Sequence, residues 1–263
     1  MRFPLRFFSA AVALMLGLAP CARALSDAEA IAGRLLVRKY ADVIVTVKAQ
    51  IFIKVTVGER TMPMNEQKVD QNGTVITTGG LVATSLTGLD PRSIFEATRP
   101  QNTGGEPVEL GQTEVKNLKI RFSDGTEVRA RIVWKDEARD LALVAPEDGA
   151  LPQNRPLSYV NLQENQAGAV ILGTYFHLSR ANEALQRAAM VRPTTVTAIL
   201  ERPKRLFLVT TDQIPDAVGC PVFDAEGRFL GIALRFTVKG LPSGSVVVPA
   251  GEILEMASRA ANS

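Results

Sequence analysis

The sequence predicts an all-β protein with a helix near each end. Residues 42–57 are rich in β-branched residues, and apolar positions alternate with polar ones there and at residues 128–134. This period of two is typical of strands that bury one face. Turn signals such as Asn72-Gly73 and Asp124-Gly125 separate the runs. Helical patterns occur at the two ends of the mature chain, so strands form the body of the protein.

The two terminal helices have recognisable start signals. Ser26 and Glu29 form a capping-box pattern that opens a helix within residues 25–41. Pro249 and Glu252 suit the first turn of a helix within residues 249–263, because a carboxylate there faces the positive helix end.

The segments between the helices are assigned in the same way. Residues 90–117 form a long connection rich in Pro, Gly, Thr and Glu, and a structureless connection of that length is usually functional or disordered. The remaining assignments are a polar loop at residues 59–71, a helical or irregular loop at 180–192, and short strands at 74–78, 194–199, 206–211, 221–223, 228–232 and 246–248.

Residues 1–24 have the features of a secretory signal peptide. Arg2 and Arg6 precede an apolar stretch, residues 9–19, that is too short to cross a bilayer. Ala22-Arg23-Ala24 predicts cleavage after Ala24, which gives a periplasmic or secreted protein without a membrane span. Lipidation at Cys21 is the second interpretation, ranked lower because Pro20 precedes the cysteine, and an uncleaved anchor is the third.

The charge balance and the cysteine content of the chain argue against several structural and functional features. Three of the 30 Lys and Arg residues lie in the leader, so the mature chain has as many basic residues as its 27 Asp and Glu. A neutral chain gives no electrostatic case for nucleic acid. Without Cys21 only Cys220 remains, so no intramolecular disulfide is expected. One His and one Cys without ligand spacing predict no metal site and no cofactor.

Three segments resemble the trypsin-like serine peptidases, and the HtrA/Deg branch in particular. They are GGLVATSLT at residues 79–87, LKIRFSDGTEVRARIVWKDEARDLALV at 118–144, and DQIPDAVGCPVFDAEGRFLGI at 212–232. The resemblance covers about residues 40–258 and implies a chymotrypsin-like double antiparallel β-barrel. It divides the mature chain into a first barrel at residues 42–145, a linker at 146–156 and a second barrel at 157–248.

The same resemblance implies that the catalytic machinery is absent. The family's catalytic His falls at Thr87, its Asp at Asp140 and its nucleophilic Ser at Val218, while its oxyanion-hole amides fall at Asp216 and Val218. Val has no nucleophile, and a Thr hydroxyl cannot act as a base near neutral pH. A carboxylate at Asp216 would oppose a developing oxyanion. We therefore expect no catalytic residues.

Two alternative roles for individual residues remain open. Asp140 can be a structural residue at a strand start that accepts backbone N–H bonds, which we prefer to a catalytic role. Cys220 can be an alternative nucleophile, alone or in a rearranged triad with His177 and Asp140, although a small buried thiol is the preferred interpretation.

Three functions follow from these assignments. The preferred hypothesis is a binding or scaffold protein that takes a protein or extended peptide in the inter-barrel cleft or at residues 90–117. The second is a divergent endopeptidase that uses Cys220 or an unrecognised Ser. The third is a structural subunit whose cleft is filled by bulky residues such as Val218 and Phe223.

Overall fold

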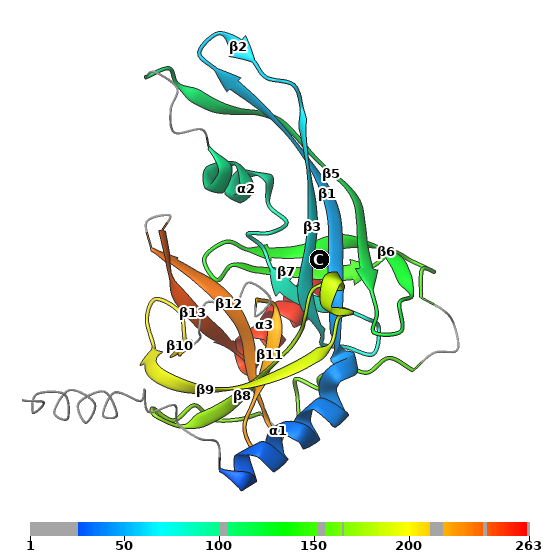
Figure 1. Ribbon diagram of the computed structural model, residues 1–263, viewed down its shortest axis with the longest axis vertical. Coiled ribbons are helices and arrows are strands. Elements are labelled where there is room, and N and C mark those ends of the chain that lie inside the picture. The colour runs from blue at the N-terminus through cyan, green and yellow to red at the C-terminus, as the bar shows by residue number, and fades with distance from the viewer. Residues whose placement is uncertain are drawn as a thin grey trace, which may run out of the picture.

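The computed structural model describes residues 26–99, 105–151, 156–164, 166–210, 218–238 and 241–261. The predicted leader and Asp216 therefore lie outside the described residues. The described chain folds into two antiparallel β-barrels, with a helix before the first strand and another after the last (Figure 1). The predicted all-β, chymotrypsin-like double barrel is confirmed.

The first barrel is a sheet in the order β2-β1-β3-β4-β7-β6-β5, and pairing between β1 and β5 closes it. Apolar residues of alternating positions, such as Val45 and Val47 of the first strand, fill its interior. The strands are β1 Ile44–Val57, β2 Arg60–Thr61, β3 Asn65–Val75, β4 Val82–Ser85, β5 Val108–Arg121, β6 Glu127–Asp136 and β7 Leu141–Pro146.

Strands β1, β3 and β5 continue beyond the first barrel as a three-stranded arm with β2 at its tip (Figure 1). Helix α2, Pro91–Thr98, covers one face of this arm. Ile94 and Phe95 of α2 belong to the same buried cluster as Ile51 and Ile53 of β1. The helix thus supplies the burial that an isolated sheet extension lacks.

The arm corrects three predictions from the sequence. Residues 59–71 are not a loop but contain β2 and more than half of β3. Asn72-Gly73 is not a turn, because both residues lie inside β3. A Cβ at Gly73 would meet Val82 and Val47, so the glycine serves close strand packing. Residues 90–117 are not a structureless connection, because α2 and most of β5 lie there.

The second barrel closes in the order β10-β13-β12-β11-β8-β9. The turn at residues 224–227 has the predicted chemistry: the Asp224 carboxylate accepts N–H bonds from Glu226 and Arg228, and Gly227 has a φ of +82°. Residues 180–192 hold a short 3-10 helix, Glu183–Leu185, before β9 begins. The strands are β8 Thr174–Arg180, β9 Ala189–Leu200, β10 Leu206–Val209, β11 Cys220–Phe223, β12 Phe229–Val238 and β13 Leu241–Pro249.

Helix α1, Asp27–Tyr40, begins with the predicted capping box, since Ser26 and Glu29 exchange both hydrogen bonds. It packs on the second barrel, where the Tyr40 ring stacks on Phe223 with 4.3 Å between centroids. Helix α3, Ala250–Ala261, buries Ile253 and Met256. No helix of the described chain combines the length and apolar character that crossing a membrane requires.

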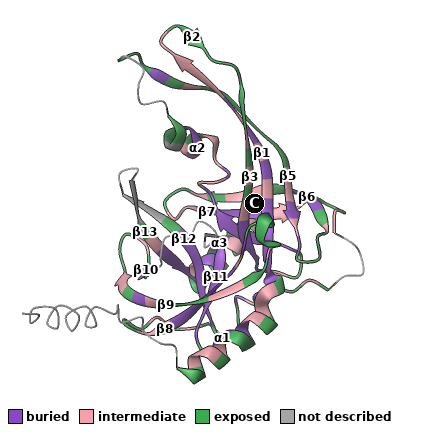
Figure 2. Ribbon diagram, in the orientation of Figure 1, coloured by how far each residue is buried: buried purple, intermediate pink, exposed green. Residues whose placement is uncertain are grey.

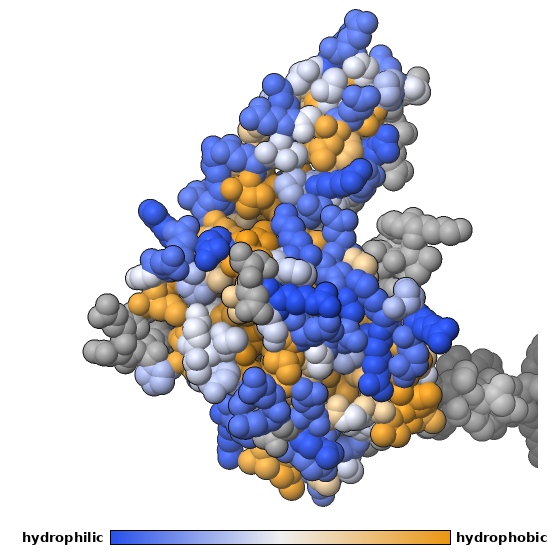
Figure 3. Space-filling model, turned by 180° about the vertical axis from the view of Figure 1, so that it is seen from behind, coloured by the Kyte–Doolittle hydropathy of each residue, from blue (hydrophilic) through white to orange (hydrophobic). Residues whose placement is uncertain are grey.

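Burial follows the two barrels and the base of the arm, whereas the arm's tip is exposed (Figure 2). Seen from behind, hydrophilic side chains cover much of the surface, with hydrophobic patches between them (Figure 3). Segments that lie far apart in the sequence meet at the junction of the two barrels.

Candidate functional site

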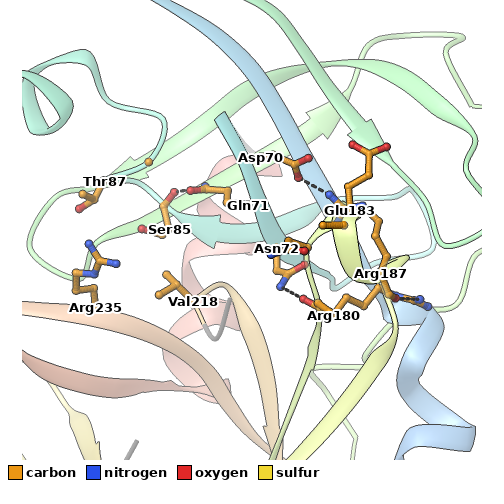
Figure 4. A pocket seen from close by; sticks show the side chains of 14 residues that line it. Asp70, Gln71, Asn72, Ser85, Thr87, Arg180, Glu183, Arg187, Val218 and Arg235 are labelled. Carbon is orange, nitrogen blue, oxygen red and sulfur yellow. Dashed lines mark hydrogen bonds and ion pairs between the residues drawn. The ribbon is translucent and has the colours of Figure 1, made fainter. Parts of the chain in front are cut away.

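A cavity of about 410 Å³ lies at this junction. Strand β3, the end of β4, the loop between β8 and β9, and strand β12 all contribute to its wall (Figure 4). The lining residues are Asp70, Gln71, Asn72, Ser85, Thr87, Gly88, Arg180, Ala181, Asn182, Glu183, Ala184, Arg187, Val218 and Arg235.

The cavity brings together two positions that the sequence singled out. Thr87, where the resemblance expects a histidine, and Val218, where it expects the nucleophile, both line the wall. Asp140 lies behind Thr87, because its carboxylate accepts the Thr87 backbone N–H at 2.6 Å. The three family-equivalent positions are thus neighbours around one space.

The Asp140 carboxylate is held by two donors. Besides the Thr87 N–H it accepts the Ser85 hydroxyl at 2.6 Å. Burial raises the pKa of Asp140, and the bonds from Ser85 and Thr87, together with the positive charge of Arg235, oppose that rise. Asp140 also has a left-handed φ of +55°, which an Asp tolerates better than most residues. Its oxygens therefore organise the loop around Thr87 instead of orienting an imidazole.

Gly219 fixes the main chain beside Val218. Its φ is +80°, its N–H donates to the Ala233 carbonyl at 2.8 Å, and its carbonyl accepts the Thr74 hydroxyl at 2.8 Å. A Cβ here would overlap the Asn72 carbonyl oxygen. The segment that carries Val218 is therefore anchored directly on the first barrel, and only glycine allows this approach.

Cys220 and His177 do not form a site with Asp140. Cys220 is fully buried in the core shared by both barrels, with its Sγ 3.8 Å from the Val218 carbonyl oxygen. His177 is a buried residue of β8, paired with Val222 of β11. The hydrogen bonds of the Asp140 carboxylate go to Ser85 and Thr87, so the rearranged triad is not assembled. Phe223 stacks on Tyr40 and is not among the residues that line the cavity.

The charged residues of the wall were missed in the sequence, because they come from segments far apart in the chain. Arg180 ends β8, the loop between β8 and β9 contributes Glu183 and Arg187, and β3 and β12 contribute Asp70 and Arg235. Arg187 pairs with Asp70, and Glu183 pairs with Arg121 at 3.1 Å. Ser85 was missed as well, although its place two residues before Thr87 in the chain could have identified it.

No cluster of His, Cys, Asp and Glu suited to a metal ion occurs in the described ranges. The wall offers hydrogen-bond donors, guanidinium groups and a valine side chain, which can hold a polar ligand. Val218 and Thr87 do not provide a nucleophile and a base for acyl transfer.

Two barrels with a cavity at their junction define a chymotrypsin-like double-barrel protein. Residues 69–232 match the family described as trypsin-like peptidase domain, and this is more than half of the chain. The chain belongs to this family.

Solved structures share the fold at low sequence identity. The HtrA-type protease AlgW with tripeptide has a TM-score of 0.54 and 13% identity, over 85% of this chain and 61% of that one. The MamO protease domain from Magnetospirillum magneticum in its apo form has a TM-score of 0.49 and 17% identity, over 82% and 96% of the two chains. No curated protein sequence matches the chain.

Proposed function

We propose that this chain is a trypsin-like peptidase homologue without peptidase activity that binds an extended peptide beside the inter-barrel cavity. The observation that carries this proposal is the cavity wall, which contains Val218 and Thr87, the residues that the sequence resemblance assigns to the family's nucleophile and base. Asp140 adds no reactive group, because its oxygens accept bonds from Ser85 and Thr87.

A strand edge beside the cavity, which has no partner among the described residues, supports peptide binding. Strand β12 pairs with β13 from Gly231 to Val238, whereas its pairing with β11 ends at Ala233. Among the described residues, positions 234–238 therefore have a strand partner on one side only. An extended peptide can supply the missing partner through main-chain hydrogen bonds. Arg235, in this stretch, also lines the cavity, so the edge leads to it.

The predicted leader supports a site of action outside the cytoplasm. Residues 1–24 predict export to the periplasm or the medium, with a protein or peptide of that compartment as the partner. Fractionation of cells that express the full chain tests this part of the proposal, since a cytoplasmic product of unprocessed length contradicts it.

Activity-based labelling tests the loss of catalysis. We expect the folded mature chain to react with neither a fluorophosphonate nor a thiol probe, with trypsin and papain as positive controls. Val218→Ser alone should stay unreactive toward the fluorophosphonate, because Thr87 gives the new hydroxyl no base. Stoichiometric labelling of the native wild-type chain at a Ser, or at Cys220 with loss in Cys220→Ala, would favour the divergent hydrolase instead.

A binding assay tests the positive half of the proposal. Fluorescein-labelled pools of random heptapeptides with free carboxyl termini, titrated with the mature chain, should show a rise in anisotropy that unlabelled peptide reverses. A folded sample, verified by circular dichroism, that gives no rise with any pool would overturn the binding role.

A further inference from the structure

We propose that a second cavity between the barrels, lined by three arginines, binds the phosphate group of a phosphate monoester. We call it the arginine cavity. Three observations carry this inference: the net charge of the lining, the exposure of the carboxylates that pair with its arginines, and guanidinium N–H groups that remain for a ligand. The inference does not depend on the proposed peptide binding, although Arg180, Glu183 and Arg187 line both cavities.

The arginine cavity has a volume of about 310 Å³, which lies within the range of small-molecule sites. Arg121 ends β5 of the first barrel, and Arg180 ends β8 of the second. The loop after β8 adds Arg187 and Glu183. Three positive charges and one negative charge give the lining a net charge of +2. A phosphate monoester, with a charge of about −1.5 to −2 near neutral pH, matches this value.

Two of the guanidinium groups are buried close to each other. The side chains of Arg180 and Arg187 are only 14% and 15% exposed. In Figure 4 they lie together with Glu183 on one side of the inter-barrel cavity. Burial lowers the pKa of Arg180, and the positive charge of Arg187 lowers it further, while Asp42 opposes the shift. Because buried like charges repel each other, an anion in the arginine cavity would lower their electrostatic energy.

The carboxylates that pair with these arginines are more exposed than the arginines themselves. Glu183, paired with Arg121 at 3.1 Å, is 67% exposed, whereas Arg121 is 27% exposed. Asp42, paired with Arg180, is 65% exposed. An exposed carboxylate gains little free energy from such a pair, so it can turn into the solvent at low cost. Since Glu183 also lines the cavity, it is the group that a ligand phosphate would replace at Arg121.

Arg121 and Arg187 have N–H groups that remain for a ligand. Within the described ranges, the Arg121 guanidinium donates only from Nη1, to Glu183, and the Arg187 guanidinium only from Nη2, to Asp70. The Arg187 Nε is buried without a hydrogen-bond partner, so the pair with Asp70 leaves this guanidinium incompletely satisfied. Arg180 differs, because it donates to three main-chain carbonyls and therefore contributes mainly its charge.

The chemistry of these groups favours a phosphate over a carboxylate. A ligand carboxylate would supply only what Glu183 already supplies to Arg121, which is one negative charge and two acceptor oxygens. A phosphate monoester has three acceptor oxygens and the larger charge, so it can bind Arg121 and Arg187 at the same time. The same group occurs in small molecules and in lipid head groups, which the experiment distinguishes.

Isothermal titration calorimetry on the mature chain tests the site at constant ionic strength. The probes are glycerol 3-phosphate, acetate, and phosphatidylcholine vesicles with and without phosphatidic acid. We expect glycerol 3-phosphate to bind at least tenfold more tightly than acetate. Binding of the phosphatidic acid vesicles in addition would assign the phosphate to a lipid head group, and binding of glycerol 3-phosphate alone would assign it to a small molecule.

Two variants should have opposite effects on glycerol 3-phosphate binding. Arg121→Gln should weaken it at least tenfold, because it removes a charge and the remaining donors. Glu183→Gln should tighten it several-fold, because it removes the competing carboxylate and the one negative charge of the lining. A merely structural role of the Arg121–Glu183 pair predicts no such gain. Arg131→Gln, at an exposed arginine on β6, is the matched control and should leave binding unchanged.

The remaining outcomes would overturn the inference and leave the proposed peptide binding unaffected. A folded wild type that binds no phosphate probe, or that binds acetate as tightly, rules out a phosphate site. A Glu183→Gln variant that binds glycerol 3-phosphate no more tightly than wild type shows that Glu183 does not occupy the ligand position. If Arg235→Gln weakens binding and Arg121→Gln does not, the phosphate lies in the inter-barrel cavity instead. Thermal melting verifies that each variant is folded.

Discussion

Asp140 is a buried acid whose ionisation works against folding. Its pKa is raised by burial above the ordinary value of 3.8, despite bonds from Ser85 and Thr87. The folded state then keeps the proton to a higher pH than the unfolded chain does. The contribution of Asp140 to the free energy of unfolding is therefore greatest below about pH 4 and falls as the pH rises through the raised pKa.

Asp140→Asn should remove this pH dependence. The amide oxygen can still accept the Thr87 N–H, and the Ser85 hydroxyl can turn to accept from the amide nitrogen. Urea unfolding between pH 3 and 8 should show the variant gaining stability relative to wild type as the pH rises. Asp148→Asn, an exposed carboxylate near the end of β7, serves as the control. A constant difference between Asp140→Asn and wild type over this range would contradict the assignment.

Gly219 is a second residue whose backbone conformation and packing restrict substitution. Gly219→Ala combines a left-handed φ with an overlap between the new Cβ and the Asn72 carbonyl oxygen. Gly149 has a similar φ of +74° but no atom within 4 Å of an added Cβ. Gly149→Ala should lower the free energy of unfolding by about 1–2 kcal/mol, the left-handed penalty alone. Gly219→Ala should lower it by clearly more in chemical denaturation, and equal losses would show that the packing at Gly219 is loose.

At the scale of elements, the sequence correctly predicted the features that depend only on residues close together in the chain. The capping box of Ser26 and Glu29 and the turn at residues 224–227 depend on neighbours in the chain, and both are present. The Asn72-Gly73 turn was wrong because packing against Val82 overrides a turn preference. The arm was missed because its polar residues on β3 look like a loop, and only pairing with β1 makes them a strand.

The residues of the candidate site form the same two groups: those that local sequence motifs identify and those that only the tertiary fold brings together. Thr87, Asp140 and Val218 could be located from the sequence because motifs surround each of them. Arg180, Arg187 and Arg235 could not, because each acquires its role from a partner or a cavity that the tertiary fold creates. Spacing along the chain carries no signal for such contacts.

Helix α1 should stabilise the second barrel through its last residue. Tyr40 stacks on Phe223 and donates its hydroxyl to the Gly227 carbonyl at 3.1 Å. Tyr40→Phe removes only the hydrogen bond and should lower the free energy of unfolding by about 0.5–1.5 kcal/mol. Tyr40→Ala also loses the ring and should lower it by up to about 3–5 kcal/mol. If guanidinium unfolding gives both variants the same stability, the stacked ring contributes nothing.

At the scale of the whole molecule, an ion-pair network joins both barrels and the C-terminal helix. Asp136, at the end of β6, pairs with Arg139 at 2.6 Å and with Lys204 of the second barrel at 3.1 Å. Arg139 also pairs with Glu252 of α3. Asp136 and Arg139 are each only 12% exposed, so water screens this network less than a surface pair.

Asp136→Asn should weaken the connection between the barrels. Burial raises the pKa of Asp136, but the bonds from Arg139 and Lys204 together hold it below the ordinary value of 3.8. The stabilisation is therefore present above about pH 4 and is lost as the pH falls through the lower, folded-state value. At pH 7 the variant should lose about 1.5–3 kcal/mol of unfolding free energy, the range for hydrogen bonds to a charged group.

The control and the pH series decide whether the network couples the barrels. Glu201→Gln removes an exposed carboxylate that pairs with Arg205 within the β9–β10 hairpin, and it should change stability by less than about 1 kcal/mol. The Asp136→Asn loss should shrink as the pH falls below 4, because the wild-type carboxylate is then protonated as well.

Since Lys204 belongs to the second barrel and Asp136 to the first, the variant should also unfold in two separable steps if this network is the main link. A single, equally cooperative transition would show instead that the apolar core shared by the barrels is sufficient to couple them.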